Sequence, residues 1–287
     1  MSVPTLRIPG RPARSARLGR PRPGVVIAAL VLLLFLLAAV WPSLFTGTGP
    51  TDGDLLATLQ APGGKHWFGT DQLGRDVFAR VVHGTRYSLT IGLAATGIAV
   101  VIATVWGLAA ALSGRFVDGL LMRTTDVMLA LPPLLLALIV VMITGKGVVG
   151  VTLAVAVSGV PGFARVIRGQ ALVVRRSGYV SAAVGLGVRR WRVAARHVLP
   201  NTLAPLLVFA TVTLGIAIAS ASALSYLGLG AQPPSPEWGA MLTEGQDYLG
   251  QAWWIAVFPG LLLVVVVLAV TVLGRHAQAR SEGRVWS

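Results

Sequence analysis

Apolar residues in this chain collect into six long runs separated by short polar segments. A hydrocarbon core of about 30 Å needs ~20 helical residues, and each run is long enough to cross it. None shows the alternating pattern of a membrane barrel strand. The pattern predicts an all-α integral membrane protein with six transmembrane helices, at residues 25–44, 88–112, about 120–143, 148–166, about 203–229 and 253–273.

The composition supports this interpretation. Of the 287 residues, 55% are hydrophobic and only 12% are charged. A soluble domain of this size does not have enough interior to bury so many apolar side chains. Because the chain contains no cysteine, a disulfide framework, a thiolate metal site and a cysteine nucleophile are excluded.

Motifs of catalysis are missing as well. The sequence has no G-x-x-x-x-G-K-[ST] phosphate loop, no H-E-x-x-H zinc motif and no G-x-S-x-G nucleophile elbow. We therefore expect a non-catalytic chain with no metal site and no cofactor of its own. If it moves a solute against a gradient, the energy must come from a partner.

The charged residues that give the formal net charge of +14 are spread unevenly between the segments that flank the predicted spans. With the N-terminus inside, most lysines and arginines fall in the internal segments 1–24, 113–123, 165–200 and 274–287, and most acids fall outside. This is the positive-inside pattern of a multi-pass membrane protein, so nucleic acid is not needed to explain the charge. We expect a bacterial inner-membrane protein with both termini in the cytoplasm.

The same pattern divides the chain into segments. The first span is interpreted as an uncleaved anchor and not a signal peptide, since its basic lead is over 20 residues long and its cleavage site is poor. The expected segments are a disordered basic tail (1–23), the anchor helix (24–45), an external linker with an interfacial segment (46–87), a five-helix core (88–274) containing a cytoplasmic loop (169–200), and a cytoplasmic tail (275–287).

Ionisable residues are nearly absent from the predicted spans. Asp126 is the exception, and Arg123, one helical turn earlier, is its expected partner. A proton-coupled carrier usually needs several acids within the membrane. The distribution therefore disfavours such a carrier.

The fifth run is rich in small and hydroxyl-bearing residues. Small side chains let transmembrane helices pack closely, which is one interpretation. The other is a wide path for a solute. The candidate path residues are Thr211, Thr213, Ser220, Ser222 and Ser225.

The largest internal loop contains the stretch GYVSAAVGLGVRRWRVAARHVLPN. Gly185 and Gly187 divide it into two short helical pieces, and the second piece is amphipathic. Leu199 precedes Pro200, which predicts that the helix ends there. Periodicity alone is compatible with a helix lying on the bilayer surface and with a docking surface for a soluble partner.

The spacing of this loop resembles a known signature. Ala182-Ala183, Gly187 and Leu199-Pro200 match the E-A-A-x3-G-x9-I-x-L-P pattern of binding-protein-dependent ABC importer permeases. Two external blocks, HWFGTDQLGRDVFARVVHGTRYSL (66–89) and SYLGLGAQPPSPEWGAMLTEGQDYL (225–249), resemble the C-type permease subunit of the dipeptide/oligopeptide/nickel branch. The resemblance covers most of the chain from about residue 65 to 274.

The resemblance implies a type I importer fold and an assembly. The expected partners are a homologous second permease, two ATPase subunits that bind ATP and Mg, and an extracytoplasmic solute-binding protein, all at the lipid bilayer. The implied cargo is a dipeptide or oligopeptide; nickel, a metallophore or another small solute is the alternative.

The resemblance also assigns residues to two groups. The implied ATPase-coupling loop contains Tyr179, Ser181, Ala182, Ala183, Gly187, Arg189, Arg190, Trp191, Arg192, Leu199 and Pro200. The external motif contains Gly69, Thr70, Asp71, Gly74, Arg75, Asp76, Gly228, Gly230, Gln232, Pro233, Pro234, Trp238 and Gly239. The external motif either contacts the second permease or the binding protein, or caps the helix bundle.

Three departures from the family pattern stand out. Ser181 occupies the glutamate position of the signature, and His197 occupies the isoleucine position. The usual acidic tail after the sixth span is replaced by GRHAQARSEGRVWS. The first departure puts in doubt the polar contact that the glutamate would make with the ATPase.

Overall fold

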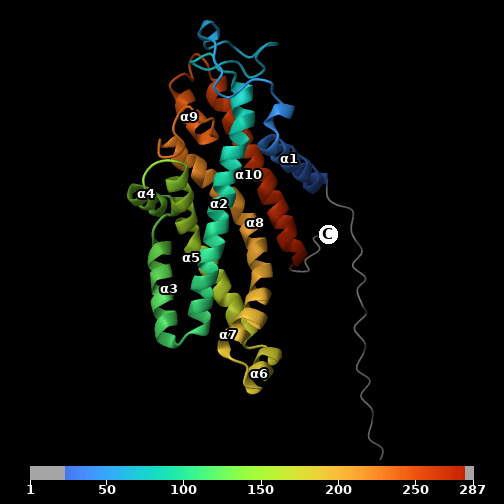
Figure 1. Ribbon diagram of the computed structural model, residues 1–287, viewed down its shortest axis with the longest axis vertical. Helices are drawn as coiled ribbons and strands as arrows, with labels where there is room; N and C mark the ends of the chain where they lie inside the picture. Colours follow the sequence, from blue (N-terminus) through green and yellow to red (C-terminus); the bar gives the residue numbers. More distant parts are fainter. Residues whose placement is uncertain (1–22, 282–287) are drawn as a thin grey trace, which may run out of the picture.

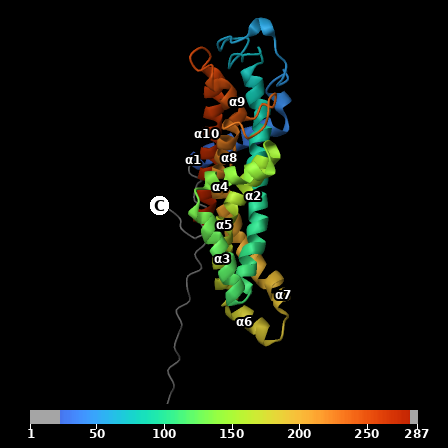
Figure 2. The same ribbon diagram turned by 90° about the vertical axis from the view of Figure 1, so that its left-hand side faces the viewer.

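The computed structural model describes residues 23–281, and within that range it is helical without a strand; two isolated bridges join Gly53 to Arg75 and Thr70 to Asp76. Figures 1 and 2 show a long bundle, with short elements gathered at its two ends. The helices are α1 (Pro23–Val40), η1 (Pro42–Leu44), η2 (Leu55–Ala57), α2 (Val77–Leu112), α3 (Arg115–Ala130), α4 (Pro133–Thr144), α5 (Val148–Arg175), α6 (Gly178–Gly185), α7 (Arg190–Val193), η3 (Ala194–Val198), α8 (Leu199–Tyr226), α9 (Trp238–Gln246) and α10 (Trp254–Ser281).

Within the described residues, five helices are long and apolar enough to cross a membrane. They are α1, α2, α5, the continuous helix that includes α8, and α10. The bent pair α3–α4 makes a sixth crossing if the two helices form one span. The helical membrane architecture predicted from the apolar runs is confirmed.

The third predicted span is not a continuous helix. α3 and α4 meet at an angle of 102° around Leu131 and Pro132. Proline has no amide hydrogen and its ring clashes with the carbonyl of residue i−4, so two consecutive prolines end α3 and restart the helix in a new direction. The bend leaves α3 upright beside α5 and turns α4 sharply away from the direction of α3 (Figure 1).

Small residues allow the central helices to approach closely. Ala95, Ala99, Ala103 and Gly107 lie four residues apart on α2, and all are buried. They form a flat ridge against α5, where a Cβ atom at Gly107 would lie 2.7 Å from the Ala164 carbonyl oxygen. This is the small-residue packing by which membrane helices gain van der Waals contact.

Two helices are longer than their apolar runs. α2 begins at Val77, where the Asp76 carboxylate accepts a hydrogen bond from the Ala79 amide at 2.9 Å and caps the first turn. The last part of the expected interfacial segment is therefore the first part of α2. Similarly, α5 continues to Arg175, into the segment expected as loop.

The expected helix end at Leu199 is wrong. The helix that begins at Arg190 continues through the π-helical turn Ala194–Val198 into α8. In this turn the Leu199 amide bonds to the Ala194 carbonyl, five residues back. The wider turn places Pro200 in the first turn of α8, where a missing amide hydrogen is tolerated.

The expected tails lie mostly outside the described residues. Residues 1–22 and 282–287 are not described, whereas Pro23 already belongs to α1. α10 continues to Ser281, so the described part of the expected C-terminal tail is helical.

Candidate functional site

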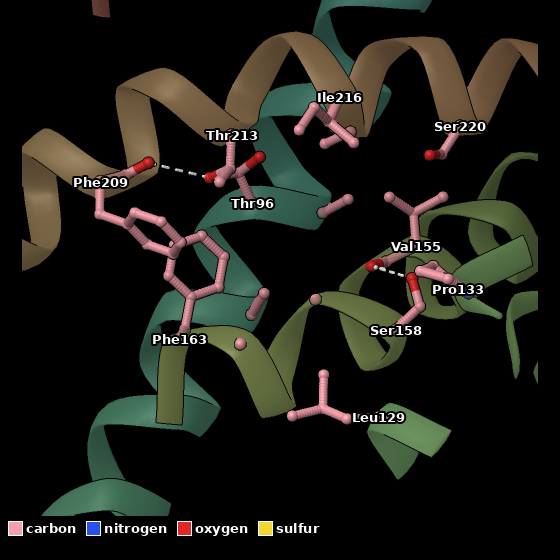
Figure 3. Close-up of a pocket in the computed structure, with 15 residues that line it drawn as sticks. Thr96, Leu129, Pro133, Val155, Ser158, Phe163, Phe209, Thr213, Ile216 and Ser220 are labelled. Atoms are coloured by element: carbon pink, nitrogen blue, oxygen red, sulfur yellow. Dashed lines mark hydrogen bonds between the residues drawn. The ribbon is translucent and has the colours of Figure 1, made fainter. Parts of the chain in front are cut away.

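A pocket of about 190 Å³ opens among the central helices. α2, α5 and α8 form most of its wall, and the bend between α3 and α4 contributes Leu129 and Pro133 (Figure 3). Phe163 of α5 and Phe209 of α8 meet edge to face at one side, with ring centroids 5.3 Å apart. The described lining is apolar except for hydroxyl groups and carries no charged side chain.

Two of the five candidate path residues line this pocket. They are Thr213 and Ser220 of α8. The Thr213 hydroxyl donates to the Phe209 carbonyl at 3.1 Å, within its own helix. The structure thus brings this pair to a common cavity.

The other three candidate path residues lie elsewhere. Thr211 faces a second, apolar cleft between α1, α2, α8 and α10. Ser222 and Ser225 are buried where α8 packs on α9, and a Cβ atom at Gly239 would lie 2.5 Å from the Ser222 carbonyl. α8 therefore presents its hydroxyl groups to three different surroundings.

The pocket also contains residues that the sequence did not single out. Thr96 of α2, Ser158 of α5 and the Phe163–Phe209 pair line it. Each lies in an apolar run that predicts a membrane helix but not which of its faces meets a cavity. No local signal in the sequence distinguishes Thr96 from the other hydroxyl residues in the spans.

The external motif is folded around a buried group of charges. Asp71 and Arg80 are fully buried, and Arg75 and Glu244 are nearly so. The Asp71 carboxylate accepts from Arg75 Nε at 2.6 Å and from Arg80 Nη1 at 2.7 Å. Glu244 of α9 accepts from the same Arg80 Nη1 at 2.7 Å. This external charge cluster ties the loop before α2 to α9, far along the chain.

Other residues of the motif make intramolecular bonds beside this cluster. Trp254 Nε1 donates to the Thr70 carbonyl at 3.0 Å, and Trp238 Nε1 donates to the Val81 carbonyl at 2.9 Å. Asp76, besides capping α2, lies 2.7 Å from His66 Nδ1. Gly69 and Gly74 take positive φ in the turns around Asp71; Gly228, Gly230, Gln232, Pro233 and Pro234 form the turn between α8 and α9, and Gly239 lies in the first turn of α9.

Glu237 caps α9 from a buried position. Its carboxylate accepts from the Gly239 and Ala240 amides at 3.0 and 2.9 Å, and Ser88 of α2 donates to it at 3.3 Å. Burial raises the pKa of Glu237, and the hydrogen bonds from the backbone amides oppose that rise. The protonated form is thus favoured relative to an exposed glutamate.

The coupling segment, residues 178–200, projects from the opposite end of the bundle (Figure 1). α6 ends in a Schellman turn, in which the Val188 amide bonds to the Ala183 carbonyl at 3.1 Å and the Gly187 amide bonds to the Val184 carbonyl at 3.0 Å. Gly187 has φ +77°, a conformation that favours glycine. The glycine of the predicted signature is therefore explained by the geometry of this turn.

One face of the coupling segment packs and the other is free. Val180, Ala183, Val193 and Val198 are buried against the ends of α2 and α5. The exposed side carries large apolar groups, with Leu186 85% and Trp191 62% exposed. Tyr179, Ser181, Ala182, Arg189 and Arg192 are exposed too, whereas Leu199 and Pro200 lie in the first turn of α8; Arg190 begins α7.

The Ser181 hydroxyl donates to the Ser177 carbonyl in the first turn of α6, at 3.2 Å. The hydrogen-bonding capacity of this hydroxyl is therefore used within its own helix. Arg192 lies over the Trp191 ring, 5.3 Å from its centroid, in cation–π contact. The exposed surface of the coupling segment is thus apolar at its centre and basic around it.

Two ion pairs join α3 to α5 near the same end. Arg168 donates to both carboxylate oxygens of Asp118, at 2.5 and 2.6 Å. Arg165 donates to Asp126 at 2.7 Å. The expected pairing of Asp126 with Arg123 is wrong, because the bundle brings a neighbouring helix closer to the carboxylate than its own previous turn.

Comparison with known proteins shows to which family the chain belongs. A model described as "binding-protein-dependent transport system inner membrane component" matches residues 99–285. The chain is 39% identical over 249 residues to the dipeptide transport system permease protein DppC of Alkalihalophilus pseudofirmus, covering 87% of this chain and 82% of that protein. It is 38% identical over 252 residues to the probable D,D-dipeptide transport system permease protein DdpC of Escherichia coli, covering 88% and 85%.

A third relative is similar to the chain over most of its length, and a solved structure shares its fold. The glutathione transport system permease protein GsiD of Pectobacterium atrosepticum is 40% identical over 252 residues, covering 87% of this chain and 83% of that protein. An inward-facing structure of the MetNI methionine ABC transporter aligns with a TM-score of 0.56 at 20% identity, covering 70% of this chain and 95% of that one. At that identity the structural likeness supports the fold alone, which is that of an ABC importer permease.

Proposed function

We propose that this chain, which belongs to the family of binding-protein-dependent transport system inner membrane components, carries peptides across the membrane as one permease subunit of an ATP-driven importer. The observation that carries this proposal is the similarity over almost the whole chain to permeases named for dipeptide, D,D-dipeptide and glutathione transport. Those names favour a peptide over nickel or a metallophore as cargo.

The proposed assembly contains a second permease, two ATPase subunits and a solute-binding protein outside the membrane. ATP and Mg would bind to the ATPases, and this chain would be non-catalytic. We place the protein in the bacterial inner membrane with both termini in the cytoplasm, because arginines concentrate at the coupling end of the bundle.

The coupling segment is the proposed ATPase contact. Its exposed apolar centre, Leu186 and Trp191, is of the kind that marks a protein interface. It is also joined to α8 without a break through α7 and the π-helical turn. A displacement of the segment would therefore move α8, which forms one wall of the central pocket.

Transport would follow from reorientation of the bundle around the central pocket. Thr213 and Ser220 remain our candidates for the path, with Thr211, Ser222 and Ser225 as the candidates that lie outside the pocket. The external motif would contact the binding protein or the second permease through exposed residues beside it, such as Trp67 and Leu73.

The test is uptake of a labelled dipeptide into vesicles that contain the complete transporter. Uptake should stop when ATP is removed while a proton gradient is maintained. Uptake that persists on the proton gradient alone would refute an ATP-driven importer and favour a proton-coupled carrier.

A further inference from the structure

The central pocket has the size of one side chain. An engineered apolar cavity of about 150 Å³ holds a benzene molecule. The 190 Å³ pocket can therefore take one aromatic or branched side chain, but not a whole dipeptide. Its aromatic wall, Phe163 and Phe209, gives an apolar group the surface it needs.

Thr96 is the unusual hydroxyl of this pocket. Thr85 and Thr104, on the same helix, each donate to the carbonyl four residues back, at 3.2 and 2.6 Å. Thr96 is 8% exposed, and its Oγ1 has no hydrogen-bond partner within the described part of the chain. Figure 3 shows its side chain directed from α2 toward α8, near Thr213. A buried hydroxyl without a partner costs free energy, so an added partner there is stabilising.

The charge distribution restricts what can enter. None of the described lining residues carries a charge. A charged side chain would lose its hydration in the pocket without gaining an ion pair, which is strongly unfavourable. An uncharged apolar side chain pays no such penalty.

We propose that this pocket is a cargo subsite for one uncharged hydrophobic side chain of the peptide, and that Thr96 Oγ1 hydrogen-bonds to the peptide group next to that side chain. This inference rests on the proposed function, because it assumes that the cargo is a peptide. On this proposal Thr96 is a cargo-binding residue, and the charge-free lining of the pocket selects hydrophobic over charged peptides at the permease itself.

The first experiment fills the pocket. A Cβ atom at Gly162, in the pocket wall, would meet nothing within 4 Å, so Gly162→Leu adds a side chain into open space. Gly97→Leu is the matched control, since Gly97 is a helical glycine with equally open surroundings that does not line the pocket. The complete transporter in proteoliposomes is supplied with ATP and with Ala-Phe, Ala-Lys or Gly-Gly, each normalised to the occupancy of the binding protein.

Wild type should transport Ala-Phe faster than Ala-Lys. Gly162→Leu should lower Ala-Phe uptake by about fivefold or more while Gly-Gly uptake stays close to that of Gly97→Leu, because Gly-Gly has no side chain to place in the pocket. Equal uptake of the three peptides by both variants would overturn the subsite but leave the importer standing. If wild type transports none of the peptides with ATP, the proposed function fails and the subsite with it.

The second experiment removes the hydroxyl. Thr96→Val keeps the shape of the side chain, and we expect about a fivefold rise in the Ala-Phe concentration for half-maximal uptake, with recovery in Thr96→Ser. Thr104→Val, which removes a hydroxyl bound within its own helix, is the control. Equal effects of Thr96→Val and Thr104→Val would overturn the role of Thr96.

A labelling measurement on wild type does not depend on any variant folding. Ala-(p-azidophenylalanine), photoactivated in the transporter, should attach to α2, α5 or α8 around Thr96, and excess Ala-Phe should prevent the attachment. The other candidate occupant is a lipid acyl chain. Labelling of this wall by a photoactivatable phospholipid that Ala-Phe does not displace would overturn the proposal.

Discussion

Arg80 of α2 and Glu244 of α9 are 164 residues apart in the chain, yet Arg80 Nη1 lies 2.7 Å from Glu244 Oε2. The same nitrogen is 2.7 Å from Asp71, so one guanidinium holds a loop and two helices together at the external end. Since Arg80 and Asp71 are fully buried, neither charge can be screened by water if the other is removed.

Arg80→Ala should therefore strongly destabilise the external end. Removing one member of a buried ion pair typically costs about 3–5 kcal/mol, because the remaining charge stays uncompensated. The measurement is the thermal unfolding midpoint of the purified protein in detergent. Arg86→Ala, an exposed arginine on the same helix, is the control and should change the midpoint little. Similar midpoints for the two variants would contradict the role of the external charge cluster.

Asp118→Asn tests a charge pair in a different setting. Asp118 and Arg168 are 26% and 31% exposed, so water partly screens the pair. We expect a loss of about 1 kcal/mol or less, clearly smaller than that of Arg80→Ala. The same unfolding assay gives the comparison, and a loss as large as that of Arg80→Ala would contradict this ranking.

Gly187→Asp and Ala183→Asp should separate the permease from the ATPases of the proposed assembly without preventing membrane insertion. Gly187 occupies a left-handed turn that other residues adopt with strain, and Ala183 is buried against the ends of the bundle, where a carboxylate would have no water. The measurement is co-purification of the ATPases with the inserted permease.

Ser181→Glu is the control for these two changes. Ser181 is exposed on the same helix, so the added carboxylate stays in water and the segment should keep its shape. We expect the ATPases to remain bound to this variant. Normal co-purification with both Gly187→Asp and Ala183→Asp would show that the ATPases dock elsewhere.

The raised pKa of buried Glu237 predicts that the stability of the folded protein depends on pH. Its pKa is raised in the folded state by burial, so folding favours the protonated carboxyl group. The contribution of the protonated carboxyl group to the free energy of unfolding is fully present below the ordinary glutamate pKa of about 4.5. It is lost as the pH rises through the higher pKa of the folded state. Glu237→Gln, which stays neutral, should flatten the pH profile of the unfolding midpoint over that range. An unchanged profile would mean that Glu237 does not titrate with folding.

Much of the architecture was predictable because apolar runs are local. A stretch such as residues 253–273 predicts a membrane helix without knowledge of its neighbours, and α10 covers all of it except residue 253. The effect of proline was less predictable. Pro132 and Pro133 break a span, whereas Pro161 and Pro205 remain inside helices, because neighbouring turns and helices decide whether the lost hydrogen bond can be tolerated.

The candidate sites likewise include features formed by neighbouring residues of the sequence and features formed only by the packing of distant helices. The structure has a glycine turn at Gly187, which a few consecutive residues after α6 suffice to form, whereas the coupling role of this segment stays a prediction. The sequence did not predict the central pocket as such. Thr213 and Ser220 were among the candidates, but Thr96 belongs to a different helix and reaches the pocket through packing.

By itself, the sequence determined that this chain is a helical membrane protein and that its loop matches the permease signature, whereas the orientation that its arginines favour stays a prediction. These properties depend on hydropathy, charge and short spacing, which act within one segment. The tertiary structure alone decided that Arg80 joins Asp71 to Glu244, that Asp126 pairs with Arg165, and that Thr96 lies unpaired in a charge-free pocket. Such relationships arise when distant helices pack, and which faces meet depends on the shapes of all the side chains between them.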